Sequence, residues 1–194
     1  MRLLIVSILA LQLAACGHAK KGAEITERIN ESNYDDLINR YTKHDTQYDG
    51  FYNRFELYAT FLNSNTQAAI LQKRSDVLEW DQKQAQSERE KMFQENSTLT
   101  KFALSLFTPS VRLNDLHKGT SIWKIYLEAG GQRYEGKAMK RNGKLEDIRA
   151  IYPYHNRWST AYDVSFNVPL SVVEKGPITF VLTSSQGTST LKFE

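Results

Sequence analysis

Residues 162–168 read Tyr-Asp-Val-Ser-Phe-Asn-Val, so large apolar side chains alternate with polar ones. This two-residue period is typical of a β-strand with one buried face, because successive side chains of a strand point to opposite faces of its sheet. Similar alternation recurs on both sides of this stretch, from residue 102 to the end of the chain. The pattern therefore predicts a β domain of which 162–168 is the clearest strand.

Turn residues separate these expected strands. The turn signals are Asn114-Asp115, Gly130-Gly131, Asn142-Gly143, Gly176-Pro177 and Gln186-Gly187. Such dipeptides favour tight turns between neighbouring strands. Seven or eight short strands joined in this way predict an antiparallel, immunoglobulin-like β-sandwich over residues 97–194.

The period changes upstream of residue 97. Between 24 and 44 apolar residues recur at spacings of three to five, which indicates an amphipathic helix. Helix-like stripes follow at 51–62 and at 67–94, and the second of these contains a seven-residue repeat. That repeat consists of Leu71, Leu78, Ala85 and Met92. The pattern predicts a helical hairpin or three-helix module over 24–96, and thus an α+β protein with its helices first.

The first 15 residues have the layout of a secretory signal peptide. Arg2 precedes an apolar run that begins at Leu3 and ends in small residues. The run is too short for a membrane-spanning helix, which needs about 20 apolar residues. The segment 1–15 is therefore expected to direct export.

The run ends in Leu13-Ala14-Ala15-Cys16, which resembles the lipobox of bacterial lipoproteins. The resemblance implies that Cys16 carries a diacylglyceryl thioether and becomes the first residue of the mature chain, with 16–23 as a short tether. Gly17, rather than Asp, implies sorting to the outer membrane if the source is Gram-negative, on either side of that membrane. The alternative is an ordinary signal peptide followed by a chance cysteine.

The amino-acid composition excludes several classes of function and of binding site. The 25 Lys and Arg residues nearly balance the 22 Asp and Glu residues, and the net charge of +3 is too small to indicate nucleic-acid binding. A single cysteine excludes intramolecular disulfides and multi-cysteine metal sites. The glycine-rich motifs of nucleotide sites are absent from the sequence, so we expect no cofactor.

Three segments of the carboxy-terminal part carry a second resemblance. They are 107–109 together with 113–116, then 121–127, and 152–158. Together they resemble a domain of uncharacterised lipoproteins from predatory and other deltaproteobacteria. No activity is known for that domain, so the resemblance transfers none to this chain.

An aromatic loop is the first candidate binding site. Its candidate residues are Tyr152, Tyr154, His155, Arg157 and Trp158. Tyr, Trp and Arg are the usual anchors of binding interfaces, so this loop could bind a sugar, a peptide or a protein. The alternative is that these aromatics are core or corner residues of the sandwich.

Residues 45–56 partly match the spacing of a calcium-binding EF-hand loop. Asp45, Asp49 and Glu56 occupy ligand positions and Gly50 occupies the turn position. Gln47 departs from the pattern, and the second hand that normally accompanies such a loop is missing. The alternative, which we favour, is that Asp49 caps a helix and Gly50 turns the chain, with no metal bound.

The sequence contains no recognised catalytic motif, such as Gly-x-Ser-x-Gly or His-Glu-x-x-His. We therefore expect a non-catalytic outer-membrane lipoprotein that binds an envelope protein or glycan. The alternative is an envelope hydrolase whose site assembles from distant residues such as His155, Asp163 and Glu135.

Overall fold

The computed structural model describes residues 31–194. The expected signal peptide 1–15, the lipobox cysteine Cys16 with its tether 16–23, and the start of the helical module all lie outside the described residues. Within the described part, no helix is both long enough and apolar enough to cross a lipid bilayer.

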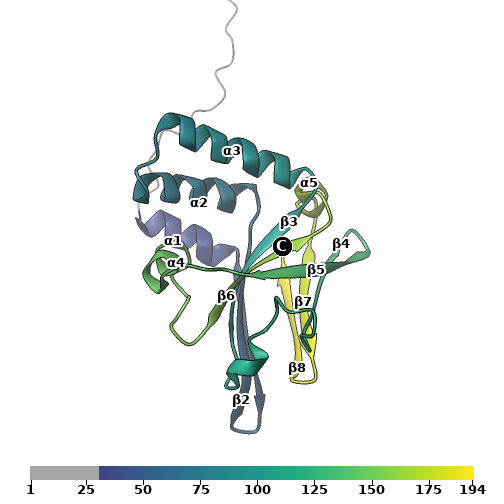
Figure 1. Ribbon diagram of the computed structural model, residues 1–194. Helices are drawn as coiled ribbons and strands as arrows, with labels where there is room; N and C mark the ends of the chain where they lie inside the picture. The colour runs from purple at the N-terminus through teal and green to yellow at the C-terminus, as the bar shows by residue number, and fades with distance from the viewer. Residues whose placement is uncertain (1–30) are drawn as a thin grey trace, which may run out of the picture.

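Eight antiparallel strands form one sheet in the order β1-β2-β3-β6-β5-β4-β7-β8. The two outermost strands, β1 and β8, lie against each other, so the sheet curls into a nearly closed barrel (Figure 1). The strands are β1 (Thr42–Asp49), β2 (Tyr52–Phe61), β3 (Thr100–Phe107), β4 (Lys124–Ala129), β5 (Gln132–Lys140), β6 (Thr160–Phe166), β7 (Ile178–Ser184) and β8 (Gly187–Phe193).

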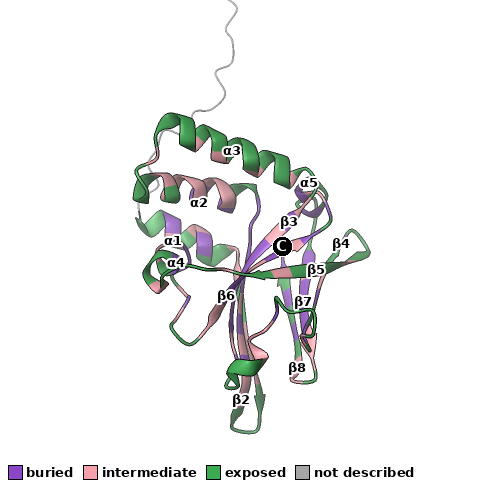
Figure 2. Cartoon of the chain, viewed as in Figure 1, coloured by how far each residue is buried: buried purple, intermediate pink, exposed green. Residues whose placement is uncertain are grey.

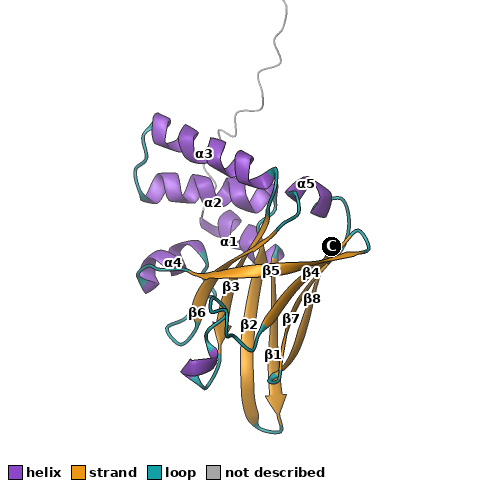
Figure 3. Cartoon of the chain, turned by 45° about the vertical axis from the view of Figure 1, so that its right-hand side comes forward, coloured by secondary structure: helices purple, strands orange, loops and turns teal. Residues whose placement is uncertain are grey.

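Helices cover one end and one side of this barrel. Figure 3 shows three of them stacked in layers, with α1 nearest the strands and α3 farthest away, while α4 lies beside α1. The helices are α1 (Glu31–Arg40), α2 (Ser64–Val77), α3 (Gln82–Asn96), the 3₁₀-helix η1 (Val111–Leu113), α4 (Leu145–Ile151) and α5 (Leu170–Val173).

The main core fills the inside of the barrel. Alternate residues of β3, namely Phe102, Leu104 and Leu106, point inward and are buried. The ring of Phe102 contacts the rings of Phe166 and Phe180 at centroid distances of 5.8 and 5.0 Å. Figure 2 shows buried segments along the strands and mostly exposed surface on α3.

A second core lies between the helices and the outer surface of the barrel. Ala103 on β3 and Ala161 on β6 point outward here, and both are buried. Because these side chains are small, Tyr34 and Ile38 of α1 can approach the sheet closely and become buried in turn. The same strands therefore support two cores.

The predicted α+β class is confirmed, but the predicted immunoglobulin-like sandwich is not. A single sheet curls on itself, and β4 and β5 pair with β7 and β6 to extend it rather than form a second packed sheet. The alternation that predicted the strand at 162–168 is confirmed, because β6 spans Thr160–Phe166. The sequence also indicates weaker strands at 132–139 and 148–152. The first is strand β5, whereas the second is wrong, since α4 occupies most of it.

The helical stripe predicted at 51–62 is also wrong, because these residues form strand β2. Gly50, with a φ of +59°, and Phe51 make the two-residue turn that joins β2 to β1. Phe55 and Leu57 then alternate into the barrel core, and β2 pairs with β3. Strands from both sides of residue 96 thus belong to one sheet, and 31–96 contains a β-hairpin as well as helices.

The single helix predicted at 67–94 is two helices. Glu79, with a φ of +50°, interrupts the helical backbone conformation between α2 and α3. Asp81 then starts α3 with a capping box, in which its side chain accepts from the backbone N–H of Gln84 while the Gln84 side chain accepts from the backbone N–H of Asp81.

Candidate ligand-binding groove

A groove runs between α2, α3 and α4 along the outer surface of the barrel. It consists of two adjoining cavities of about 320 and 210 Å³. Three charged residues, Arg74, Arg141 and Asp163, line both cavities. They come from α2, from the residue after β5 and from β6, so the groove exists only in the folded chain.

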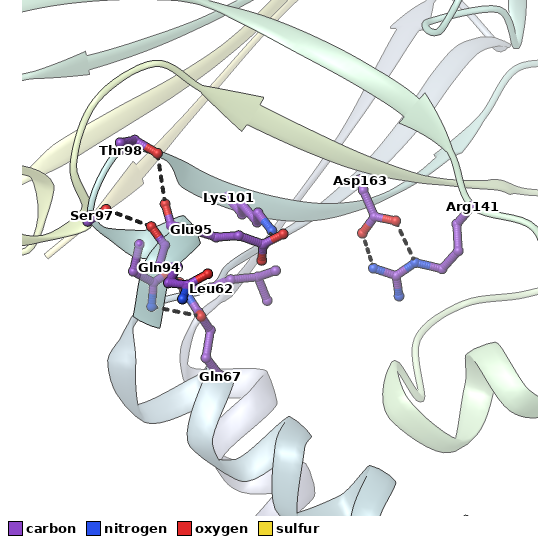
Figure 4. Close-up of polar contacts among 10 residues, drawn as sticks. Leu62, Gln67, Gln94, Glu95, Ser97, Thr98, Lys101, Arg141 and Asp163 are labelled. Atoms are coloured by element: carbon purple, nitrogen blue, oxygen red, sulfur yellow. Dashed lines mark hydrogen bonds and ion pairs between the residues drawn. The ribbon is translucent and has the colours of Figure 1, made fainter. Parts of the chain in front are cut away.

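An ion pair joins two of these residues. The Arg141 guanidinium donates Nε–H to Oδ2 of Asp163 at 3.1 Å and Nη2–H to the other carboxylate oxygen. Figure 4 shows the two side chains facing each other. The Arg141 side chain is only 14% exposed, whereas the Asp163 side chain is 46% exposed. The carboxylate can therefore still be reached from solvent.

Tyr152 supports the guanidinium from beneath. The Arg141 guanidinium lies over the Tyr152 ring at 4.5 Å from its centroid and also donates to the Tyr152 hydroxyl at 3.3 Å. Burial alone would lower the pKa of Arg141, but Tyr152 and Asp163 together raise it above its ordinary value. The guanidinium is therefore a fixed positive charge in the groove.

The walls of the groove are apolar on two sides. Ile148 and Ile151 of α4 contribute one wall, and Val77 and Leu78 at the end of α2 contribute the other. Val77 and Leu78 are more than half exposed although they are aliphatic. A groove with apolar walls and a few fixed polar groups is the usual form of a small-ligand site.

Salt bridges occupy most of the charges along the α3 side. Lys101 pairs with Glu95 at 2.6 Å, and Lys91 pairs with Glu88. Arg74 differs from them, because its side chain forms no salt bridge with any residue in the range 31–194. Arg74 is therefore the cation in the groove that can take an anionic ligand without breaking an ion pair.

No family model, curated protein or solved structure matches the chain.

The structure divides the aromatic loop among three places. Tyr152 lies under Arg141 at the groove, whereas Tyr154 and His155 pack against the outside of the barrel. Arg157 and Trp158 stay exposed, with the guanidinium 5.9 Å from the centre of the indole ring system. The predicted binding edge thus supplies one residue to the groove.

A chain of hydroxyls holds Tyr154 in place. Thr42 donates to the carbonyl oxygen of Ile38, so Thr60 must donate to Thr42 and the Tyr154 hydroxyl to Thr60, at 2.6 Å for the last bond. Burial raises the pKa of Tyr154 well above its ordinary value, and Tyr152 adds to the effect. Tyr154 is therefore a neutral structural hydroxyl.

His155 forms a buried pair with Ser105, whose Oγ lies 2.8 Å from His155 Nδ1. Burial lowers the pKa of His155, and the guanidinium groups of Arg141 and Arg149 lower it further. No hydrogen bond in the described part of the chain joins His155 to Asp163 or Glu135. Asp163 is held by Arg141, and Glu135 lines a separate hollow beside Arg133 and Lys137.

The predicted calcium loop lies in the β1–β2 hairpin instead of between two helices. Asp49 pairs with Arg54, Glu56 contacts His44 at 3.1 Å and Asp45 accepts a hydrogen bond from Gln47. Across residues 31–194, no three or more His, Cys, Asp or Glu side chains are grouped so as to hold a metal ion. The helical flanks of the calcium hypothesis and the helix cap expected at Asp49 are both wrong, because this segment is a β-hairpin, while Gly50 does turn the chain.

Sequence reasoning did not select Arg74 or Arg141. Each is one basic residue among 25, and neither lies in a motif. Only the position of Arg141 beside the Asn142-Gly143 turn signal marks it as the end of a strand, where functional side chains often lie.

Proposed function

We propose that this protein is a lipoprotein of the bacterial outer membrane whose folded part is a non-catalytic binding module. The lipobox at Leu13–Cys16 supports the anchor, and the groove between α2, α3 and α4 supports the binding role. The single observation that carries the binding role is Arg74, a cation without a salt-bridge partner among residues 31–194, beside the Arg141–Asp163 pair.

The ligand that best fits this groove carries a carboxylate next to an aliphatic group. Arginine binds carboxylates through two parallel hydrogen bonds, and Arg74 has its donors free for such a pair. Val77, Leu78 and Ile148 would bury an aliphatic side chain of the ligand. The carboxyl terminus of a peptide in an envelope component combines both features.

Defined peptides test this proposal on the full chain. We would titrate tetrapeptides ending in Leu or Ala, with the terminal carboxylate either free or amidated, and follow binding by calorimetry. We expect binding of the free acids, and Arg74→Gln should weaken it more than tenfold, since a charged hydrogen bond contributes about 1.5–3 kcal/mol.

The matched control is Arg112→Gln in η1, which is exposed and does not line the groove. It should bind like the wild type. Equal affinity for amidated and free peptides, or an unchanged affinity in Arg74→Gln, would contradict the proposed ligand class.

The anchor has its own test. Cells that express the full chain and are fed radioactive palmitate should label the protein, and Cys16→Ala should abolish the label. Labelling that persists in Cys16→Ala, or no labelling of the wild type, would refute lipidation at Cys16. This outcome is independent of the peptide titration.

A further inference from the structure

The β1–β2 hairpin ends in an exposed aromatic tip, which we define as Tyr48, Phe51 and Tyr52. The pairing of Asp49 with Tyr52 leaves Gly50 and Phe51 as a two-residue loop. Phe51 is fully exposed, and Tyr48 and Tyr52 are 62% and 60% exposed. Figure 1 shows this hairpin projecting from the barrel at the end opposite α1–α3.

The tip carries no net charge. Between residues 48 and 54 the charged residues are Asp49 and Arg54, and they pair with each other at 2.5 Å. The polar groups next to the aromatics are therefore already matched within the hairpin. A surface of this kind has no electrostatic preference for an acidic or a basic partner.

The size of the tip argues against a protein partner. A large aromatic side chain buries about 150–250 Å² when it is fully covered. Because Phe51 is fully exposed and the two tyrosines are 62% and 60% exposed, the three side chains expose on the order of 450 Å² together. A stable protein interface needs about 800 Å² from each partner. The tip is too small for such an interface but large enough to enter the surface of a bilayer.

The order of side chains along the hairpin matches the polarity profile of a bilayer. Phe51 forms the apex, the cross-strand pair Asp49–Tyr52 lies directly behind it, and the pair Tyr48–Asn53 comes next. The charge of Asp49 is matched there by its ion pair with Arg54. Phenylalanine favours the hydrocarbon, whereas the tyrosine ring lies at the headgroup level with its hydroxyl toward water. A protein patch would require no such order.

We propose that the aromatic tip inserts into the headgroup region of a lipid bilayer, with Phe51 deepest. This contact does not involve α1, because Figure 1 places that helix at the opposite end of the described part of the molecule. It also does not depend on the groove. The neutral tip requires no anionic lipid.

A fluorescent label at the tip tests this contact in the full chain. Every sample carries Cys16→Ser, so that lipid cannot attach there and the label has one site. The environment-sensitive dye NBD is attached to Phe51→Cys, and to Phe93→Cys as the matched control. Phe93 is also an exposed phenylalanine, but it lies on α3 at the opposite end.

We expect phosphatidylcholine vesicles to shift the emission of the dye at position 51 to the blue and to raise it at least twofold. Lipids with a quencher just below the headgroup should then quench it, while the dye at position 93 stays unchanged. Replacing both Tyr48 and Tyr52 by Ser should reduce the response at position 51.

Three results would overturn the proposal. They are an unchanged emission at position 51 with vesicles present, an equal response at positions 51 and 93, and a response confined to vesicles that carry a membrane protein. The last result would mean that the tip binds protein rather than lipid. Circular dichroism of each labelled variant establishes that the fold is intact.

Discussion

At the scale of single residues, Gly136 shows how tightly the barrel interior is filled. A Cβ at this position in β5 would lie 2.7 Å from Cε1 of Phe166 and 3.0 Å from Cγ2 of Ile125. Both neighbours are buried and cannot move aside. We therefore expect Gly136→Ala to lower the free energy of unfolding by about 1–3 kcal/mol, as overpacking does, measured by urea denaturation.

Gly119→Ala is the control for this substitution. A Cβ at Gly119 meets no atom within 4 Å, so the free energy of unfolding should change by no more than about 0.5 kcal/mol. Equal unfolding midpoints for Gly136→Ala and Gly119→Ala would show that the barrel interior yields at Phe166.

The burial of His155 should make the folded protein less stable in acid. Its ring is buried, and burial, followed by Arg141 and Arg149, lowers its pKa in the folded state. The unfolded chain has a histidine pKa of about 6.5. Above that pH the ring is neutral in both states, and stability is fully retained. As the pH falls below it, the unfolded state takes up a proton that the folded state refuses, so stability declines.

The measurement is the free energy of unfolding at pH 7.5 and 5.5. The wild type should lose more stability over this interval than His155→Gln, which cannot titrate at this site. His117→Gln, at an exposed position, should keep the pH dependence of the wild type. If His155→Gln keeps it too, protonation of His155 does not govern the acid sensitivity.

At the scale of elements, the two-residue alternation of apolar and polar side chains predicted a strand well where one face of that strand is polar. The alternation at 162–168 located β6 to within two residues, because Asp163 and Ser165 mark its outer face. In β2 the outward residues Tyr58 and Thr60 are themselves covered by Tyr154, so the alternation of Phe55, Leu57 and Ala59 was hidden. Tertiary contacts thus decided the structure of β2.

The α2–α3 boundary was missed for the opposite reason. The heptad of Leu71, Leu78, Ala85 and Met92 continues across a real break, because α3 packs against α2 after the turn. The local signal was present in Asp81 and Gln84, a capping pair that starts a helix. The spacing of hydrophobic residues alone could not reveal this helix boundary.

The candidate groove could not be predicted, because its charged residues lie far apart in the chain. Arg74 and Arg141 are brought together by the pairing of β6 with β5 and by α2 folding back over the sheet. Tyr152 was selected as an aromatic anchor, yet its place under Arg141 follows from tertiary structure. The sequence could indicate which residue types bind ligands here, but not which of them lie close together in the folded chain.

Helix α3 should respond locally to loss of its cap. None of its residues is buried, so its stability depends on the capping box and on its contacts with α2. We expect Asp81→Ala to destabilise α3 by about 1 kcal/mol and to speed amide hydrogen exchange over Gln82–Asn96 about fivefold. The exchange in β3 should not change.

Asp81→Asn is the matched control, because asparagine is an equally good N-cap. It should keep the exchange rates of the wild type. Faster exchange in β3 as well as in α3 after Asp81→Ala would show instead that α3 and the barrel unfold together.

At the scale of the whole molecule, strands β3 and β6 form a shared wall between the inner core of the barrel and the outer core under the helices. Phe102 and Leu104 of β3 face the barrel interior, while Ala103 between them faces the helices. On β6, Tyr162 faces inward and Ala161 faces outward. Loss of the helical layer would expose the outer side of both strands, and loss of the barrel would leave α1 without a surface to pack on.

This shared wall predicts that α1, which packs directly on it, unfolds together with the barrel, whereas α3 has no buried residue and can open by itself. Ile38 of α1 is fully buried in the outer core, and Leu127 of β4 is fully buried in the inner core. Each change to Ala should lower the free energy of unfolding by about 2–4 kcal/mol, through lost burial and an unfilled cavity. Both variants should still unfold in a single transition.

Two probes decide whether the unit is cooperative. Hydrogen exchange in α1 follows the helix that packs on the wall, and hydrogen exchange in β7 (Ile178–Ser184) follows the strands on the far side of the barrel, over the same range of urea concentrations. In Ile38→Ala the two should report the same lowered midpoint. If α1 opens early while β7 keeps its wild-type protection, the barrel stands alone and the wall of β3 and β6 does not couple the two cores.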